Sequence, residues 1–495
     1  MFEISYKSEG KGLKKSKKMA VLAFFNKEKL KNETDEFIKK HNIVIPDILM
    51  DKFLGHDEES VKAYTYSSPE IIKLVKYDVK KLNTDFFRNS VSKFIIELSS
   101  EKVSSASIFI PEDKVFLKIF NTKNNYLRSF IEGAGLGNYE FNKYKSDKKK
   151  SLKLDVVFHS GFSKDFEEAI KTSRNVLEAV YFSRDIINEP AISLTPEILA
   201  EKTMKLFKNT SVTVEVWDKK ELRKNKMNAI LAVGGASSND PRLIILKYKS
   251  TKKNCPKIAL VGKGVTYDSG GLSIKPTSSM LDMKIDMSGA AAVIGAIYAA
   301  AKNKLDADLI GVIPAVENML SGSSYKPGDI IKTYSGKTIE VLDTDAEGRI
   351  ILADALYYAS KQNPDEIIDL ATLTGACVVA LGEYAAGIFT QNDQISGGLI
   401  KAGNETFERV WSFPMWDEYA ELIKSDVADI SNLGPRWGGA ITAAKFLENF
   451  VTKPEKWVHI DLAPAGKNKL NSYSEKYHTG FGVRLLYRYI EMMQD

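Results

Sequence analysis

Short apolar runs and stretches with helical spacing alternate along residues 191–495. The apolar runs are typical of buried strands, and they cover residues 242–248, 258–261, 309–315, 366–371 and 457–462. Between them, the spacing of apolar residues predicts helices over residues 288–302 and 350–361, with Ser288 as a candidate N-cap of the first. Such alternation is typical of an α/β fold with a mostly parallel central sheet flanked by helices.

The first 165 residues show a different mixture. Strand-like runs cover residues 19–25, 107–110, 115–120 and 154–159, and charged segments with helical spacing separate them. We therefore expect a smaller α/β domain over residues 1–165. Apolar residues then recur with helical spacing until Pro190 stops the pattern, so residues 166–190 are expected to form a connecting helix and residues 191–495 a larger domain.

The composition agrees with two soluble domains. A chain of 495 residues exceeds one hydrophobic core, and its 44% hydrophobic and 27% charged residues are ordinary for a globular protein. The longest uncharged apolar stretches, 289–301 and 370–382, are shorter than the ~20 residues of a membrane span, so no membrane association is expected. The two cysteines, Cys255 and Cys377, have neither metal nor redox spacing, which favours a reducing, cytoplasmic location.

Charged residues are concentrated just after the apolar run at 258–261. The window from residue 258 to 289 is rich in glycine, which allows the backbone to approach other groups closely. It also holds four charged side chains: Lys263, Asp268, Lys275 and Asp286. In parallel sheets, sites form beyond the carboxyl ends of strands, which is where Lys263 and Asp268 fall.

A second window, residues 341–356, supplies Asp345, Glu347 and Arg349 at alternate positions. An extended backbone would point these three side chains to the same side. We interpret the two windows as halves of one site.

Like-charge repulsion indicates what such a site would hold. Two carboxylates about 4 Å apart repel each other by roughly 4 kcal/mol at an effective dielectric constant of about 20. Divalent cations relieve this repulsion; oxygen ligands suit magnesium or manganese, and zinc also accepts carboxylates. Ordinary surface salt bridges are the alternative for each charge taken singly. The joint pattern of glycines, charges and framing apolar runs favours a site with two ions.

The motifs resemble those of the leucine (cytosol) aminopeptidases, a family of dinuclear metallopeptidases. The resemblance rests on VGKGVTYDSGGLSIKP (261–276), MKIDMSGAAAV (283–293), NMLSGSSYKPGD (318–329), DTDAEGRIILADAL (343–356), DLATLTGA (369–376), GGAITAAKFL (438–447) and TGFGVRLL (479–486). It is weaker over residues 132–144 and 184–200, and most of the first 130 residues hardly share it.

The resemblance implies that residues 191–495 form the catalytic metallopeptidase domain. By motif position it makes five residues ligands of two divalent ions, manganese or zinc: Lys263, Asp268, Asp286, Asp345 and Glu347. It makes Lys275 and Arg349 the catalytic residues. The charge pattern singles out the same seven positions.

The family's activity implies release of N-terminal amino acids, leucine-like residues preferred, from peptides by water that two metal ions activate. Lys275 would stabilise the oxyanion, Arg349 would hold a bicarbonate, and Leu373 would line the substrate pocket through backbone contacts. Lys263 coordinates only as a neutral amine, which at pH 7 costs about 4 to 5 kcal/mol unless a cation lies nearby. Family members form hexamers of two stacked trimers, so a homohexamer is expected.

Three positions depart from the family pattern. Asp343 stands where Asn is usual, Ser288 stands where a second glycine is common, and DLAPAG at 461–466 replaces a run similar to DIAG. None of them removes a predicted ligand or catalytic residue. If its segment is extended, Asp343 lies on the same side as Asp345, and we expect it to accept the hydrogen bond that Asn would accept.

Two other functions remain open on sequence alone. The net charge of +6 and the basic segment FNKYKSDKKKSLK (141–153) allow contact with nucleic acid, although a solvated loop or helix end is favoured. A catalytically inactive paralogue is the other alternative, and the presence of all seven predicted polar residues argues against it.

Overall fold

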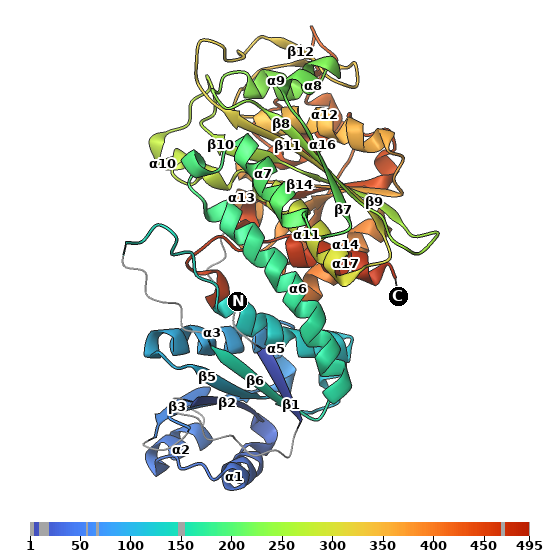
Figure 1. Ribbon diagram of the computed structural model, residues 1–495. Coiled ribbons are helices and arrows are strands. Elements are labelled where there is room, and N and C mark those ends of the chain that lie inside the picture. Colours follow the sequence, from blue (N-terminus) through green and yellow to red (C-terminus); the bar gives the residue numbers. More distant parts are fainter. Residues whose placement is uncertain are drawn as a thin grey trace. The chain divides into compact units, whose positions relative to one another are not determined.

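The computed structural model describes residues 4–8, 19–55, 58–65, 69–146, 154–466 and 471–494. The chain forms two compact units. Unit 1 consists of Met1–Leu177 with Leu470–Tyr473, and unit 2 of Glu178–Lys469 with Ser474–Asp495. The boundary falls within the long helix α6 (Ser163–Asn188), which Figure 1 shows in green. Both units contain helices and strands, so the predicted α/β class, with a smaller unit before a larger one, is confirmed.

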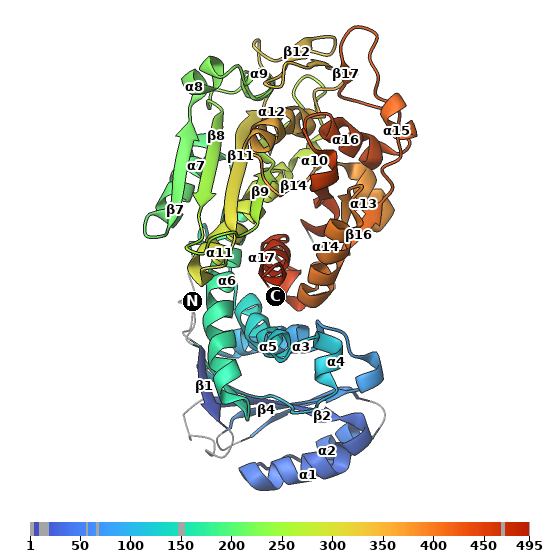
Figure 2. The ribbon, with the colours of Figure 1, turned by 90° about the vertical axis from the view of Figure 1, so that its right-hand side faces the viewer.

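Unit 1 is built on a six-stranded sheet in the order β1-β6-β5-β2-β4-β3. Neighbouring strands are parallel except for β3 with β4. Helices α3 and α5 cover one face of the sheet, and α1 and α2 cover the other (Figure 2). The strands are β1 (Ile4–Ser8), β2 (Met19–Asn26), β3 (Ser60–Tyr64), β4 (Ile71–Tyr77), β5 (Ser105–Phe109) and β6 (Asp155–Ser160), and the helices are α1 (Leu30–His41), α2 (Asp47–Leu54), α3 (Phe86–Glu101) and α5 (Lys123–Gly137).

One predicted strand of unit 1 is wrong. The apolar run at 115–120 forms a short helix, α4 (Phe116–Phe120). Asp113 accepts a hydrogen bond from the backbone N–H of Val115, which turns the chain before the helix. Phe116 and Phe120 are four residues apart and both buried. This spacing places them on one face of a helix and equally on one face of a strand, so the apolar run alone did not decide between the two.

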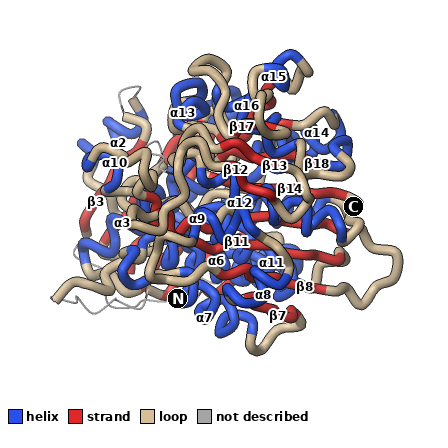
Figure 3. Tube along the Cα trace, turned by 90° about the horizontal axis from the view of Figure 1, so that it is seen from above, coloured by secondary structure: helices blue, strands red, loops and turns tan. Residues whose placement is uncertain are grey.

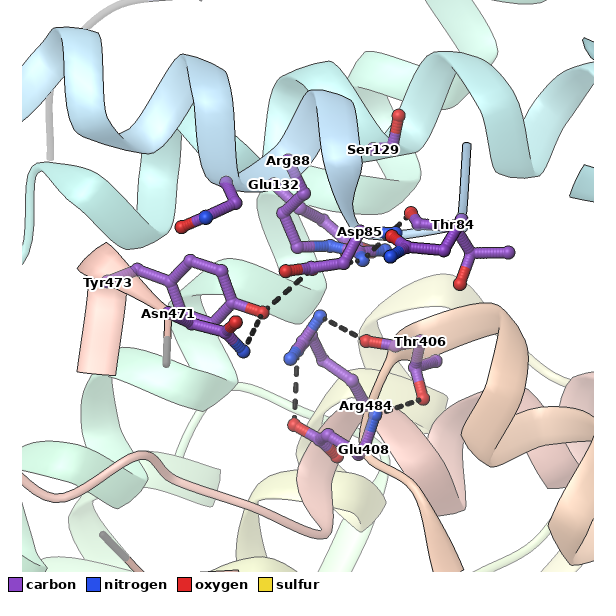
Figure 4. Close-up of polar contacts among 12 residues, drawn as sticks. Thr84, Asp85, Arg88, Ser129, Glu132, Thr406, Glu408, Asn471, Tyr473 and Arg484 are labelled. Atoms are coloured by element: carbon purple, nitrogen blue, oxygen red, sulfur yellow. Dashed lines mark hydrogen bonds and ion pairs between the residues drawn. The ribbon is translucent and has the colours of Figure 1, made fainter. Parts of the chain in front are cut away.

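A late segment of the chain belongs to unit 1. The Tyr473 hydroxyl donates a hydrogen bond of 2.8 Å to Asp85, and Arg88 also donates to that carboxylate at 2.8 Å (Figure 4). The same guanidinium pairs with Glu132 at 2.8 Å. Ser472 adds bonds to Asn89 on the same helix. Buried charges need such partners, so this cluster ties residues 472 and 473 to α3.

Unit 2 contains a nine-stranded sheet in the order β16-β15-β18-β14-β9-β11-β8-β7, with β10 pairing to β11. The central strands β18, β14, β9 and β11 are parallel, and antiparallel pairs lie toward both edges. The strands are β7 (Val212–Trp217), β8 (Arg242–Tyr248), β9 (Lys257–Gly262), β10 (Gly264–Asp268), β11 (Asp308–Asn318), β14 (Glu366–Ala371), β15 (Ala386–Phe389), β16 (Val410–Phe413) and β18 (Trp457–Asp461). A small third sheet joins β12 (Ile330–Lys332), β13 (Thr338–Glu340) and β17 (Ile430–Ser431).

Helices border the strands of unit 2 (Figure 3). Helix α11 (Ser288–Asn303) packs on β9 and β14, and α12 (Glu347–Lys361) packs on β9 and β11. Alternation along β9 sends Ala259 and Val261 into the core shared with α12 and the intervening residues to the opposite face. The other helices are α7 (Pro196–Phe207), α8 (Lys219–Lys224), α9 (Asn228–Gly234), α10 (Thr277–Met280), α13 (Gly375–Leu381), α14 (Asp393–Thr406), α15 (Glu418–Glu421), α16 (Gly439–Glu448) and α17 (Val483–Met492).

A buried ion pair fixes the start of α17. The Glu408 carboxylate accepts hydrogen bonds from the backbone N–H groups of Gly482 and Leu485 at 3.0 and 2.9 Å. Arg484 pairs with the same carboxylate and donates to the carbonyl of Thr406 at 2.8 Å (Figure 4). The free N–H groups of a helix start are satisfied by an anion in this way.

The strands and the two helices predicted for residues 191–495 are confirmed. The strands that were not predicted are β7, β10, β12, β13, β15, β16 and β17. One N-cap prediction is wrong. Ser288 is not an N-cap, because Met287 precedes the helix and no side chain caps it. Ser288 lies in the first turn of α11, where its hydroxyl donates to the carbonyl of Ile285.

Within the described residues, one segment, Met283–Asn303, is long and apolar enough to cross a membrane by length and composition. Of this segment's apolar window, 83% is buried inside the fold. That burial is typical of a core helix in a globular protein.

Candidate metal centre

The predicted site residues come together at one edge of the unit 2 sheet. Lys263 directly follows β9, and Asp268 is the last residue of β10. Asp286 lies in the turn before α11, and Glu347 is the first residue of α12. Strands β9 and β10 are successive, and both pair in parallel with β11, β9 along residues 308–312 and β10 along residues 315–318. Lys263 and Asp268 therefore lie toward the carboxyl end of the sheet, as expected for a site in such a sheet.

Glycines allow α11 to begin directly against the strands. The backbone N–H of Lys263 donates to Leu370 at 3.0 Å, and that of Ala290 donates to the Lys263 carbonyl at 2.9 Å. A Cβ atom on Gly289 would lie 2.0 Å from the Leu370 oxygen, and one on Gly262 would lie 2.6 Å from the Gly289 oxygen. Only glycine fits at such distances.

Three buried carboxylates form the centre of the site. Oxygens of Asp268, Asp286 and Glu347 all lie within 4.8 Å of one another. The side chain of Asp345 lies two residues before Glu347 and is partly exposed, at 34%. The expectation that Asp345, Glu347 and Arg349 share an extended segment is wrong, because α12 begins at Glu347. A helix separates residues two positions apart by roughly 200° around its axis.

Lys263 lies between two of these carboxylates. Its Nζ is 2.7 Å from Asp286 Oδ1 and 2.8 Å from Glu347 Oε1, and it donates to the carbonyl of Thr372 at 2.9 Å. Burial alone would lower the pKa of Lys263, but the charges of Asp286 and Glu347 outweigh it and raise the pKa. Lys263 is therefore a cation held between Asp286 and Glu347.

Lys275 has the same role on the other side of the cluster. Its Nζ is 2.8 Å from Asp268 Oδ2 and also pairs with Asp345. Burial opposes the charged form, yet the Asp268 carboxylate raises the pKa of Lys275. Its side chain is 15% exposed, so it reaches the cluster from the solvent side.

The carboxylates themselves are held in unfavourable surroundings for a negative charge. Burial, with the neighbouring Asp268, raises the pKa of Glu347 and raises that of Asp345 to about 7. Burial also raises the pKa of Asp286 well above its usual range. Among the described residues, Asp286 Oδ2 and Glu347 Oε2 have no hydrogen-bond partner although both are buried. These unpaired oxygens and the surplus negative charge fit divalent cations.

Arg349 lies in the first turn of α12 and is 7% exposed. Burial lowers its pKa to about 10, so it stays cationic at neutral pH. Its Nη1 donates to the carbonyl of Asn432 at 2.8 Å.

Residues after β14 contact the cluster as well. The Thr372 hydroxyl donates to Asp286 Oδ1 at 2.7 Å, so this residue touches both Asp286 and Lys263. The N–H of Leu373, which was predicted to line the substrate pocket through its backbone, donates to Asp461 at 3.1 Å.

Three neutral residues in contact with these loops escaped the sequence reasoning: Asn318, Thr344 and Asn432 are all 0% exposed. Charge density singles out ionisable groups and gives no weight to a buried amide. Asn318 does fall at the start of the motif NMLSGSSYKPGD, which was the one available signal.

Comparison with known proteins decides the family. Residues 181–487 match the catalytic domain of the cytosol aminopeptidase family. The chain belongs to the cytosol aminopeptidase family. A probable cytosol aminopeptidase of Aquifex aeolicus is 43% identical over 448 residues, which is 89% of each chain. A probable cytosol aminopeptidase of Chloroherpeton thalassium is 38% identical over 502 residues, 97% of each chain.

Solved structures of two enzymes share the fold. A mutant of tomato leucine aminopeptidase matches with a TM-score of 0.88 and 32% identity, covering 99% of this chain and 97% of that one. The bottromycin maturation enzyme BotP in complex with Mn matches with a TM-score of 0.82 and 27% identity, covering 96% and 99%. As a cytosol aminopeptidase family member, the protein is a metal-dependent hydrolase that removes residues from the N-terminus of peptides.

Proposed function

We propose that the protein releases N-terminal amino acids, leucine-like residues preferentially, with two divalent ions bound by Lys263, Asp268, Asp286, Asp345 and Glu347. The observation that carries this proposal is the buried cluster in which carboxylate oxygens lie within 4.8 Å and two of them lack a hydrogen-bond partner in the described chain. Bound there, the ions would supply an activated water as the nucleophile. Manganese or zinc suits the ligands, and the Mn in the BotP structure supports manganese.

The position of Lys263 supports its assignment as a ligand. Its nitrogen lies 2.7 and 2.8 Å from Asp286 and Glu347, so it reaches any ion that these two carboxylates share. To coordinate, Lys263 must lose its proton, and a divalent cation beside it supplies the electrostatic reason.

Lys275 and Arg349 are proposed as the catalytic residues. Once the carboxylates of Asp268 and Asp345 bind ions, the Lys275 ammonium is available to stabilise negative charge on the carbonyl oxygen of the peptide. Arg349 is buried, cationic and planar, which suits a bicarbonate held through paired hydrogen bonds.

The decisive experiment combines metal analysis with an amino-acyl anilide series. The purified protein should contain two divalent ions per chain, lose activity on chelation and regain it with manganese or zinc. Leucyl anilide should be the best substrate of the series. Asp286→Asn should lose metal, whereas Asp282→Asn, an acidic residue in the preceding turn, should keep it. Full activity of the metal-free protein contradicts the proposal.

We also propose a homohexamer in the cytoplasm. The names of the relatives, which are called cytosol aminopeptidases, support this location. Native mass spectrometry and cell fractionation test both points. Contact with nucleic acid is not favoured, and residues 147–153 of the basic segment lie outside the described part of the chain. Salt-sensitive retention of DNA in a gel-shift assay would reverse that preference.

A further inference from the structure

We propose that Asn318 is a positioning residue that holds Asp268 and the turn before Glu347 in the arrangement that the metal centre requires. The inference rests on the proposed assignment of Asp268 as a metal ligand. Asn318 ends β11 and is the register partner of Asp268 at the end of β10. Two parallel strands thus end side by side with a neutral amide next to a carboxylate, and the amide is 0% exposed.

Asn318 fixes the orientation of the Asp268 carboxylate. Its Nδ2 donates to Asp268 Oδ1 at 2.8 Å, and the backbone N–H of Gly270 donates to the same oxygen at 2.9 Å. The other oxygen, Oδ2, is the one that faces Lys275 Nζ at 2.8 Å. With Oδ1 occupied by two donors, Oδ2 is the oxygen left to meet a cation.

The same nitrogen reaches the second half of the site. Asn318 Nδ2 also donates to the carbonyl of Thr344 at 3.0 Å, directly before Asp345. The Tyr325 hydroxyl donates to that carbonyl at 2.7 Å, and the Thr344 hydroxyl donates to the Gly270 carbonyl at 2.6 Å. One amide therefore sets the spacing between the loop after β10 and the turn that leads into α12.

An amide meets these demands where other side chains do not. Its NH₂ group has two donors for two acceptors, and it adds no charge to a cluster of four carboxylates. Turning the amide around would place Oδ1 against Asp268 Oδ1 and the Thr344 carbonyl, so the hydrogen bonds determine its orientation. Asn318 Oδ1 has no hydrogen-bond partner among the described residues. It faces Gly271, and a Cβ atom added to Gly271 would lie 3.0 Å from it.

Asn239 provides a matched control. It donates a hydrogen bond of 2.9 Å to the carboxylate of Glu317, the residue directly before Asn318 in β11. Because side chains alternate along a strand, Glu317 points away from the face that Asn318 and Asp268 share. Asn239→Leu therefore removes an equivalent amide–carboxylate bond outside the metal centre.

The test is titration of the metal-stripped, full-length protein with manganese(II) by calorimetry, together with kinetics on leucyl anilide. Asn318→Leu keeps the volume of the side chain and removes both donors. We expect it to bind manganese about 10- to 100-fold more weakly and to lower kcat at saturating metal, with little change in KM. Asn239→Leu should bind manganese as the wild type does.

The inference is overturned if the wild type binds two ions and Asn318→Leu binds manganese with the same affinity as the wild type. That result would leave the proposed function intact. If the wild type fails to bind two ions, or Asp268→Ala binds them normally, the proposed function itself fails. Circular dichroism of the metal-free proteins checks folding. Should Asn318→Leu not fold, Asn318→Ser, which keeps one donor, is judged by the same affinity criterion.

Discussion

The backbone carbonyl of Asn432 accepts a hydrogen bond of 2.8 Å from Arg349 Nη1. The side chain of Asn432 forms hydrogen bonds with residues 342 and 343, in the turn that leads to Asp345. Its Oδ1 accepts from the N–H of Leu342 at 2.7 Å, and its Nδ2 donates to the carbonyl of Asp343 at 2.6 Å. One buried residue thus connects the proposed bicarbonate site with the turn that carries Asp345.

Asn432→Ala should therefore lower kcat by about tenfold or more, because the turn that leads to Asp345 loses the side-chain bonds that hold it beside Arg349, while the backbone carbonyl that accepts from Arg349 remains. The unfolding free energy should fall by about 1 to 3 kcal/mol, the cost of leaving buried polar groups unpaired. Asn392→Ala is the matched control, since its side chain also makes three bonds to backbone, at the start of α14. The control should lose stability and keep kcat. Equal kcat values for both variants would contradict the anchoring role.

Lys275→Ala should separate chemistry from metal binding. We expect kcat to fall by roughly 100-fold or more, the scale of losing one oxyanion donor. Metal content should stay at two ions, because removal of a competing ammonium from Asp268 leaves the carboxylate free to coordinate. Metal analysis and steady-state kinetics measure the two effects. Loss of both ions would show that Lys275 has a different role.

Gly348→Ala tests the placement of Lys263. A Cβ atom at this position would lie 2.5 Å from Lys263 Cε and 2.7 Å from Nζ, so the lysine has to move. We expect weaker binding of one ion, measured by titration with manganese(II), at nearly unchanged stability because alanine is a better helix former than glycine. Gly322→Ala is the control, since nothing lies within 4 Å of its Cβ position. Unaltered metal binding in Gly348→Ala would argue against Lys263 as a ligand.

Asp343→Asn restores the residue that is usual in the family. Asp343 Oδ1 accepts a hydrogen bond of 2.8 Å from the N–H of Asp345, a bond that an Asn carbonyl oxygen also accepts. We therefore expect kcat within about tenfold of the wild type, or roughly 1.4 kcal/mol in activation free energy. A loss beyond about 100-fold, or loss of one ion, would identify Asp343 as a further ligand or proton carrier.

The buried carboxyl group of Asp354 should make the stability of the protein depend on pH. Burial raises the pKa of this carboxyl to about 7, although three backbone N–H groups donate to it. The unfolded chain releases this proton at about pH 4, so between about pH 4 and 7 the folded state binds more protons than the unfolded state. The unfolding free energy should then fall as the pH rises through this window. Denaturant titrations at several pH values measure this change. The unfolding free energy of Asp354→Asn should fall less steeply with pH than that of the wild type, and an equal dependence on pH would refute the assignment.

The sequence alone determined the α/β class, the strands β8, β9, β11, β14 and β18 of unit 2, and the charged residues that cluster at the candidate site. Buried strands and amphipathic helices leave periodic apolar patterns, which depend on neighbours within a few residues. The sequence singled out three carboxylates of the site, Asp268, Asp286 and Glu347. Each lies near glycines and apolar runs, where burying an unpaired charge costs free energy unless a partner such as a cation offsets it. The errors lie where several local patterns are equally compatible with the residues, as at 115–120, which forms α4, and at 345–349, where a helix begins.

Only the tertiary structure decided which groups hold the charged residues in place. Asn318 lies 50 residues from Asp268 in the chain, and Asn432 lies 83 residues from Arg349, so no spacing in the sequence connects them. The neighbouring ends of β10 and β11 bring the first pair together, and Asn432, which directly follows β17, meets Arg349 in α12. Hydrogen bonds of neutral amides act over about 3 Å and leave no pattern of charge or hydropathy, because their effect depends on where the fold places them.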